Sequence, residues 1–140
     1  MARICGNIAS DEARHASAYK SFVQKVFEID PSEMMKAFED MMRKRIVMPA
    51  HFLREKGLPK GSAFRHFSEA AQRIGVYTAT DYVDILRSLI NEWKIDKIRD
   101  LTDAGEKARE YVMTLPDRLA KLAERISPQP SEYRFSWITM

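Results

Sequence analysis

The stretch from residue 4 to residue 29 constrains the fold of this chain more than any other part of the sequence. Its apolar residues recur at intervals of three and four, which places their side chains on one face of an α-helix. This face comprises Ile4, Ile8, Glu12, His15, Tyr19, Phe22, Val23 and Val26. The pattern predicts a helix over residues 4–29 that ends at Asp30-Pro31, because a residue before proline is pushed out of the α region.

Two polar residues, Glu12 and His15, interrupt the apolar face. A carboxylate placed there is costly unless it is paired or binds a metal ion. Residues three apart project side by side from a helix, so Glu-x-x-His offers one oxygen and one nitrogen ligand. An alternative stays open, in which Glu12 is partly exposed and pairs with Arg14, Lys20 or Lys25. The position on the apolar face favours a metal-ligand pair.

Length and composition are those of one globular domain. The chain has 140 residues, of which 45% are apolar and 31% charged, and only five are glycines. The single cysteine, Cys5, excludes an internal disulfide and is predicted to be a small core residue. Because no apolar run approaches the ~18 residues of a membrane span and no export or organelle signal is apparent, we expect a soluble protein without a membrane partner.

Basic residues are concentrated between Arg43 and His66. This segment holds seven basic residues and one acidic residue, a net charge of +6, whereas the whole chain carries +3 and the remainder therefore −3. Such a segment attracts an acidic partner, although a solvated loop and helix end would give the same pattern. Nucleic acid is disfavoured as the partner, because the charge is modest and no basic-aromatic recognition helix is present.

Two further helices are predicted on either side of a break at Pro49. The earlier helix covers residues 33–46, and the five methionines between positions 34 and 48 are interpreted as adaptable core filler rather than a binding groove. Ser62 caps the later helix, which ends at Gly75. The residues that this later helix is expected to bury are Phe64, Phe67, Ala71 and Ile74.

The next two predicted helices cover residues 80–98 and 103–126. Thr78 or Thr80 caps the former and Thr102 caps the latter, because a threonine hydroxyl can accept a hydrogen bond from an unpaired N–H group of the first turn. The apolar side of residues 80–98 comprises Tyr82, Ile85, Leu86, Leu89, Ile90 and Trp93. The predicted fold class is therefore all-α.

Prolines interrupt the C-terminal part of the chain. Pro116 is either a kink or the first residue of a new helix. Pro128 and Pro130 end the helical pattern, and residues 127–140 are predicted to form a short extended tail. Three apolar residues of this tail are available to dock on the body of the protein, namely Phe135, Trp137 and Ile138.

The other two histidines, His51 and His66, are interpreted as structural or surface residues. We identify no carboxylate or cysteine at ligand spacing from either of them. The sequence also contains no Gly-rich phosphate loop, no nucleophile elbow and no Cys-x-x-Cys pair. The Glu12–His15 pair is therefore the main chemical motif of the chain.

Several ordered segments resemble a known family. They are ICG, DEARH and AYK in the first helix, then FEIDP, DMMRKRIVMPAH, AQRIGVYTA followed one residue later by DY, EWKIDK and the closing FSWI. Together they span essentially the whole chain and are similar to the soluble acyl-[acyl-carrier-protein] desaturases, which are ferritin-like di-iron enzymes of plant plastids and some bacteria. The resemblance implies the C-terminal part of a ferritin-like helical bundle.

The resemblance also implies a chemistry. Two irons bridged by carboxylates activate O₂ and introduce a cis double bond into an acyl chain carried by acyl carrier protein, with electrons from ferredoxin. Glu12 and His15 match the second of the family's two Glu-x-x-His motifs and would be iron ligands. Asp11 matches an acidic neighbour that orients a ligating imidazole. Ala16 departs from the family, in which an acid tends to follow the histidine.

The implied partners and the missing ligands define what we expect of the chain. An acidic acyl carrier protein makes Arg43, Lys44, Lys56 and Lys60 the candidate docking residues. A di-iron bundle uses six ligands, of which this chain supplies two. We therefore expect residues 1–140 to be a single partial domain, the C-terminal half of a desaturase, inactive by itself and homodimeric when complete.

The compartment is expected to be the bacterial cytoplasm or the plastid stroma. Two other functions stay open. One is a non-catalytic helical module that docks an acidic partner, and the other is a different ferritin-like di-iron oxidase or reductase subunit.

Overall fold

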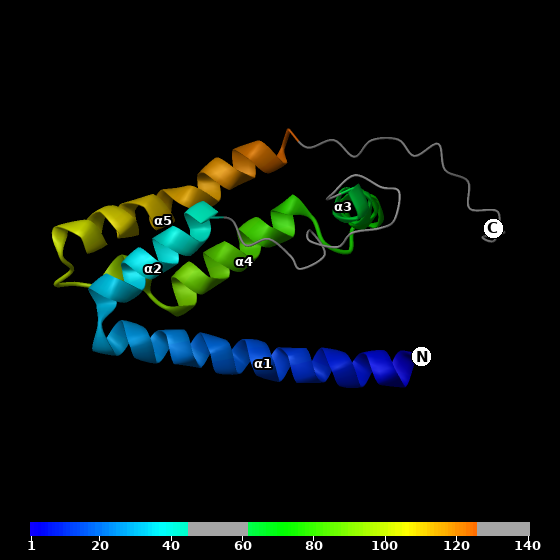
Figure 1. The fold of residues 1–140 in the computed structure, drawn as a ribbon, viewed down its shortest axis with the longest axis horizontal. Helices are drawn as coiled ribbons and strands as arrows, with labels where there is room; N and C mark the ends of the chain where they lie inside the picture. Colours follow the sequence, from blue (N-terminus) through cyan, green and yellow to red (C-terminus); the bar gives the residue numbers. More distant parts are fainter. Residues whose placement is uncertain (45–61, 126–140) are drawn as a thin grey trace. The chain divides into compact units, whose positions relative to one another are not determined.

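The computed structural model describes residues 1–44 and 62–125, and every regular element in these ranges is helical (Figure 1). The elements are α1 (Ala2–Ile29), α2 (Pro31–Lys44), α3 (Ser62–Ile74), α4 (Ala79–Glu92), the 3-10 helix η2 (Ile95–Lys97) and α5 (Asp103–Ala123). The all-α prediction is confirmed, as expected for part of a ferritin-like bundle. The predicted tail lies outside the described residues, as do His51, Lys56 and Lys60.

The chain divides into two compact units. The first contains α1, α2 and Asp84–Asp117, and the second contains α3, the start of α4 up to Val83 and the end of α5 from Arg118. Units of this size occur within one domain as well as in separate domains. The single partial domain therefore stays a prediction.

Trp93, directly after α4, is the centre of the core of the first unit. Its ring lies 5.8 Å from that of Phe27 in α1 and 5.4 Å from that of Phe38 in α2. All three side chains are buried, and the indole N–H of Trp93 donates a hydrogen bond of 3.2 Å to the backbone carbonyl of Lys20. The core thus joins the second half of α1 to α2 and α4. Its other buried members are Met35, Leu86, Ile90, Ile95, Ala108, Val112 and Leu115.

Asp30 both ends α1 and starts α2. Its backbone N–H donates to the carbonyl of Val26 at 2.9 Å, and its side-chain Oδ1 accepts from the N–H of Glu33 at 3.1 Å. The latter bond satisfies a donor that a helix N-terminus would otherwise leave unpaired. Pro31 suits the first position of α2, where its missing N–H costs nothing. The helix end predicted at Asp30-Pro31 is confirmed.

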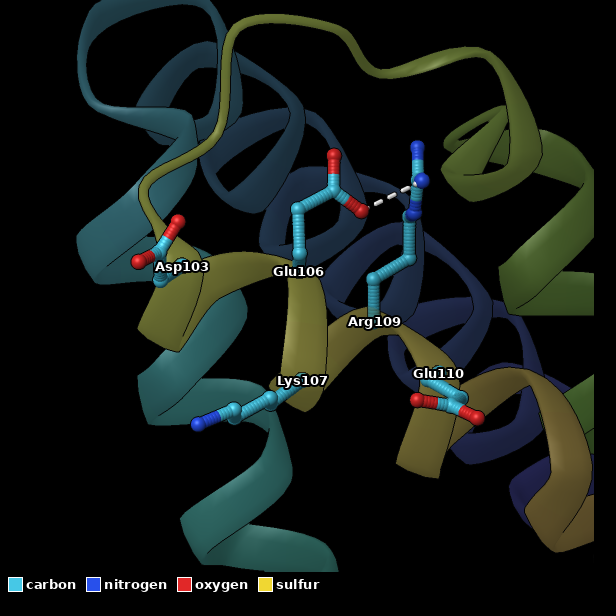
Figure 2. A pocket seen from close by; sticks show the side chains of 5 residues that line it. All are labelled: Asp103, Glu106, Lys107, Arg109 and Glu110. Carbon is cyan, nitrogen blue, oxygen red and sulfur yellow. Dashed lines mark ion pairs between the residues drawn. The ribbon is translucent and has the colours of Figure 1, made fainter.

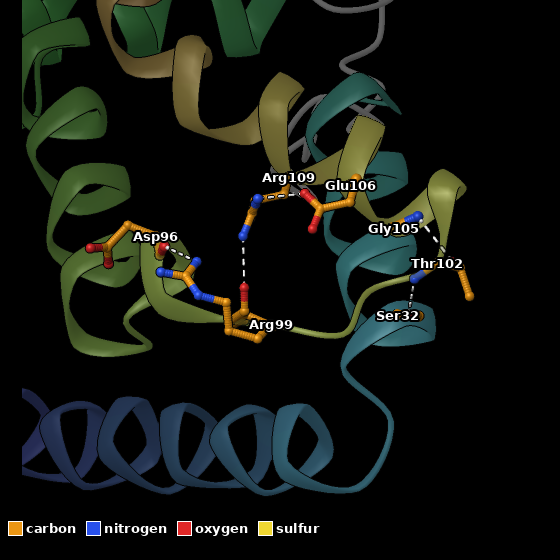
Figure 3. A network of polar contacts seen from close by, with 8 residues as sticks. Ser32, Asp96, Arg99, Thr102, Gly105, Glu106 and Arg109 are labelled. Atoms are coloured by element: carbon orange, nitrogen blue, oxygen red, sulfur yellow. Dashed lines mark hydrogen bonds and ion pairs between the residues drawn. The ribbon is translucent and has the colours of Figure 1, made fainter.

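Polar contacts hold the connection between α4 and α5 in place (Figure 3). Arg109 Nη1 donates to the carbonyl of Ile98 at 2.7 Å, and the N–H of Thr102 donates to Ser32 Oγ at 2.9 Å. Thr102 Oγ1 in turn accepts from the N–H of Gly105 at 3.2 Å, which confirms Thr102 as the cap of α5. The connection is thereby tied to both α2 and α5.

The predicted helix over residues 80–98 is too long. α4 ends at Glu92, and Lys94 adopts a left-handed conformation with φ of 50° before η2 begins. Positive φ is uncommon for residues other than glycine. The sequence has no glycine or proline here, so nothing in it marks this break. Ile95, the first residue of η2, is fully buried, and its packing fixes the position of the chain after this break.

The predicted end of α5 is wrong, and the predicted end of α2 lies outside the described residues. α5 runs continuously to Ala123 with Pro116 inside it, so the alternative in which Pro116 begins a new helix is wrong. α5 also ends before the predicted residue 126. α2 is described as far as Lys44, and the last predicted residues of this helix lie outside the described ranges.

In the second unit, α3 ends at a glycine as predicted. Gly75 has φ of 67°, a conformation that costs a residue without a Cβ very little. Its N–H donates to the carbonyl of Gln72 at 3.3 Å, and the N–H of Val76 donates to that of Ala71 at 3.1 Å. This pair of bonds satisfies the last carbonyls of the helix in the manner of a Schellman motif.

Thr78, not Thr80, caps α4. Its Oγ1 accepts from the N–H of Asp81 at 3.2 Å, while Asp81 Oδ2 accepts from the hydroxyl and the N–H of Thr78 at 2.7 and 2.6 Å. This reciprocal arrangement is a capping box with aspartate in the acidic position. The hydrogen bond from the Thr78 hydroxyl, and next that from its backbone N–H, lower the pKa of Asp81 below its usual value.

Some residues predicted to be buried are exposed. Ala71 is buried, but Phe67 and Ile74 in α3 are 58% and 73% exposed, and Ile85 in α4 is 50% exposed. Helical spacing identifies residues on a common face, whereas burial also needs a second element against that face. None of the described helices is both long and apolar enough to cross a lipid bilayer.

Candidate metal site

Glu12 and His15 lie side by side on α1, as their spacing predicts. Glu12 Oε2 is 3.5 Å from His15 Nδ1, and the two side chains are 73% and 62% exposed, respectively. The pair therefore presents one carboxylate and one imidazole from a single helix face. These are ligand types that iron and zinc both accept.

The expectation that this face is buried is wrong within the described structure. Every residue from Met1 to Tyr19 is exposed, and Phe22 is 63% exposed. Cys5, predicted to be a small core residue, is exposed as well. The period of the apolar stripe is correct, but exposure along this half of α1 means that no described element covers the stripe. Glu12 therefore carries no desolvation cost in this structure.

Asp11, which was expected to orient the imidazole, pairs with a different residue. Its carboxylate forms an ion pair with Arg14. Arg14 Nη1 also donates to Ser10 Oγ at 3.2 Å. Because these side chains are exposed, their contacts contribute little to stability. The role of Asp11 beside His15 stays a prediction.

A polar contact near the middle of α1 was not foreseen. Lys20 Nζ lies 2.7 Å from Glu92 Oε2 at the end of α4. The pair borders a cavity of about 270 Å³ whose lining also includes Ser21, Gln24, Lys25 and Trp93. The partners are 72 residues apart, and no sequence periodicity relates residues on different helices. Only the tertiary fold brings them together.

Arg43 and Lys44, two of the four candidate docking residues, are each paired with an acid one turn earlier in α2. Arg43 Nη2 lies 2.7 Å from Glu39 Oε1, and Lys44 Nζ lies 2.5 Å from Asp40 Oδ2. The guanidinium carbon of Arg43 also lies 3.8 Å from the ring centre of Tyr111, a cation–π contact. Arg43 therefore has a structural role in addition to its charge.

A charged cavity of about 540 Å³ lies along the first turns of α5 (Figure 2). Its lining residues are Asp103, Glu106, Lys107, Arg109 and Glu110, of which Glu106 and Arg109 point toward one another and pair at 2.5 Å. All five come from one helix, and none is a cysteine, serine or histidine. Charges of both signs on one helix are typical of a solvated face.

Within residues 1–44 and 62–125, no group of three or more His, Cys, Asp or Glu side chains is arranged to hold a metal ion. His66 does have a carboxylate neighbour that sequence analysis missed, since its Nδ1 lies 3.9 Å from Glu69 Oε2 three residues later. His66 is exposed, which confirms it as a surface residue. A complete metal site at Glu12 and His15 would need further ligands.

Residues 1–139 match the family described as fatty acid desaturase. The chain therefore belongs to the fatty acid desaturase family, and the resemblance of its ordered segments is confirmed.

Individual relatives are similar along almost the whole chain. It is 50% identical over 141 residues to the stearoyl-[acyl-carrier-protein] 9-desaturase, chloroplastic, of Ricinus communis. It is 46% identical over 142 residues to the palmitoyl-[acyl-carrier-protein] 4-desaturase 3, chloroplastic, of Ophrys sphegodes. Each match covers 99% of this chain and 35% of the relative, so the chain spans about a third of the length of these proteins. The names share the carrier protein and differ in the acyl group.

Proposed function

We propose that this chain is part of an acyl-[acyl-carrier-protein] desaturase and contributes Glu12 and His15 as ligands to its iron centre. Two observations carry this proposal: the chain belongs to the fatty acid desaturase family, and a carboxylate and an imidazole lie 3.5 Å apart on one of its helix faces. Relatives named as acyl-carrier-protein desaturases favour this function over a non-catalytic module and over another di-iron oxidase or reductase.

The two side chains fit part of an iron centre. Carboxylate oxygen and imidazole nitrogen are suitable ligands for iron, and di-iron bundles place Glu-x-x-His pairs on facing helices. Two ligands leave a bound ion open to water and exchange, so we propose that the other ligands come from outside the described residues. When bound, the iron would supply O₂ activation for the removal of two hydrogens from the acyl chain. Glu12 and His15 would hold the metal, and Ile8 and Tyr19 would exclude water from it once this face is covered.

The experiment measures iron in a chimera that joins this chain to the parts of the Ricinus communis relative outside the matched region. After anaerobic loading with Fe²⁺, we expect about two irons per chain. Glu12→Ala or His15→Ala should reduce this content by at least half, because each removes one ligand. Glu28→Ala is the matched control, since Glu28 is exposed on the same helix and pairs with Lys25 at 2.7 Å.

Two results would contradict the proposal. Undiminished iron in the Glu12→Ala chimera would show that this helix face does not bind the metal. Stoichiometric, tightly held iron in the 140-residue chain alone would show that the remaining ligands are not needed. The isolated chain is expected to be inactive and to hold little iron for the same reason.

We also propose that Lys44, Lys56 and Lys60, together with Arg43, dock an acidic acyl carrier protein. The support is the net charge of +6 between Arg43 and His66, together with relatives whose names include the carrier protein. Attraction between opposite charges speeds encounter and weakens with added salt. Arg43 is a poor test residue because it also contacts Tyr111.

Charge reversal of the three lysines to glutamate in the chimera should weaken carrier-protein affinity at least tenfold at low ionic strength. The control reverses Lys25, Lys36 and Lys107, which changes the net charge equally outside the basic segment. Isothermal titration calorimetry at two salt concentrations distinguishes the two sets. Equal losses in both sets would mean that only total charge matters and would reject a local docking site.

The remaining assignments follow the same resemblance. We propose a ferredoxin electron donor, a homodimeric complete enzyme and location in the plastid stroma. The word chloroplastic in the names of the relatives favours the plastid over the bacterial cytoplasm.

A further inference from the structure

The second compact unit contains a small cavity lined by residues of α3, the turn after it and the start of α4. Its volume is about 200 Å³, below the roughly 300–1,000 Å³ of typical small-molecule sites. A cavity of this size suits one or two inserted side chains. The lining residues, all uncharged, are Phe67, Ser68, Ala71, Gln72, Tyr77, Thr78, Ala79 and Tyr82.

Apolar residues are exposed on the elements that form this cavity. Phe67 and Tyr77, which line it, are 58% and 46% exposed, and Ile74 and Val76 in the same segment are 73% and 71% exposed. Scattered single exposures are normal, but four within eleven residues beside a cavity indicate a surface that binds another segment. The occupant should be apolar and without net charge, since the lining offers no charged partner.

We propose that the C-terminal segment of this same chain, residues 127–140, binds here and inserts Trp137 into the cavity. The segment carries one acid, Glu132, and one base, Arg134, so these side chains add no net charge. In an extended chain, residues two apart lie on the same side, which gives Phe135 and Trp137 a common face. The lining also supplies hydroxyl and amide oxygens, on Ser68 and Gln72, that can accept the indole N–H.

The length of the chain allows this contact. The described part of the second unit ends at Arg125, and Trp137 is twelve residues further on. An extended chain of that length spans up to about 40 Å, whereas a compact unit of roughly 60 residues has a diameter of about 27 Å. The tail therefore reaches any point on the unit to which α3 and the end of α5 both belong.

Covalent connection also favours the tail over a separate partner. A tethered segment is present at an effective concentration in the millimolar range, so a weak apolar contact is sufficient for occupancy. An acidic partner is disfavoured because none of the eight lining residues is basic. A second copy of the chain would bring the same tail, and dilution separates that case from the intramolecular contact.

The experiment labels the full 140-residue chain with 5-fluorotryptophan. Its two tryptophans, Trp93 and Trp137, give two ¹⁹F signals, and Trp137→Phe identifies them. The H₂O/D₂O isotope shift of each signal measures exposure of that indole to solvent. We expect the shift of Trp137 to be less than half that of free 5-fluorotryptophan, and Ala71→Asp to restore the full shift.

Ala70→Asp is the matched control, because Ala70 is the exposed neighbour of Ala71 and does not line the cavity. It should leave the Trp137 signal unchanged. The helical circular dichroism of each variant reports folding of the whole chain, because the buried Trp93 belongs to the first unit and reports only on that unit. If Ala71→Asp lowers the helical circular dichroism, the variant has unfolded, and Phe67→Ser, at a residue already more than half exposed, then decides the question.

Three results would overturn the proposal. The first is a fully exposed Trp137 in the parent chain. The second is a protected Trp137 that neither Ala71→Asp nor Phe67→Ser releases, since the tail would then bind elsewhere. The third is protection that disappears on dilution, since the cavity would then hold the tail of a second copy.

Discussion

The two parts of α1, before and after Tyr19, have the same helical backbone but differ in their contacts with other helices. Every residue from Met1 to Tyr19 is exposed, whereas the second half contains buried Phe27 and half-buried Lys20, Val23 and Gln24. Phe27 contacts Trp93, and the carbonyl of Lys20 accepts a hydrogen bond from that indole. Among the described residues, the first half has only its own backbone hydrogen bonds and exposed pairs within the helix.

This difference bears directly on the metal ligands. Most helix stability in proteins comes from tertiary packing of an apolar face. Glu12 and His15 lie in the half without such packing. Any element that covers Ile4, Ile8 and Tyr19 would therefore stabilise the helix and enclose the ligand pair at the same time.

The largest expected effect compares two phenylalanines of α1. Phe27 is 6% exposed and Phe22 is 63% exposed. Phe27→Ala should lower the free energy of unfolding by about 3–5 kcal/mol because it leaves a cavity beside Trp93. Phe22→Ala should change it by no more than about 0.5 kcal/mol. Urea denaturation followed by circular dichroism measures both, and equal losses would mean that the exposed face and the buried face of α1 are supported alike.

A smaller effect is expected at the boundary between the halves. Lys20 and Glu92 form a pair of half-exposed side chains that links α1 to α4, with relative exposures of 37% and 43%. Lys20→Met should cost about 0.5–1 kcal/mol at low salt and less at high salt, because exposed ion pairs are screened.

Lys25→Met is the matched control for this substitution, since Lys25 pairs with Glu28, three residues away in the same helix. It should change stability less than Lys20→Met. If the two variants respond equally in denaturation at 20 mM and 500 mM NaCl (roughly 20 and 4 Å of screening length), the contact between the helices carries no more weight than a contact within one helix.

The smallest effect concerns the capping box of α4, which joins two residues only three positions apart in the sequence. Thr78 lowers the pKa of Asp81, so the stabilisation from this carboxylate is fully present above the ordinary aspartate pKa and is lost as pH falls through the lowered value. Thr78→Val should raise the pKa of Asp81 toward 3.8, its unperturbed value. NMR titration of the Asp81 carboxyl carbon measures the change.

Thr80→Val serves as the control, because Thr80 is exposed two residues further along the same turn. It should leave the titration of Asp81 unaltered. A shift of equal size in both variants would assign the lowered pKa to the helix terminus in general instead of to the Thr78 hydroxyl.

Local signals in the sequence predicted the helices and most of their ends. Asp30-Pro31, Gly75 and Thr102 act on N–H and carbonyl groups within a few residues of themselves, so their effects are readable without the fold. The same holds for Glu12 and His15, because a spacing of three places two side chains together on any helix. Family membership was also predicted from ordered segments of the chain.

Only the tertiary structure decided which helix faces are buried and where α4 stops. Trp93 meets Phe27 and Phe38 across three helical segments, and Lys94 takes a positive φ that no residue pattern announces. Periodicity relates residues of one helix, whereas burial depends on which other element reaches that face. For this reason the apolar stripe with Glu12 and His15 was recognised correctly as a face, while its exposure followed from the fold alone.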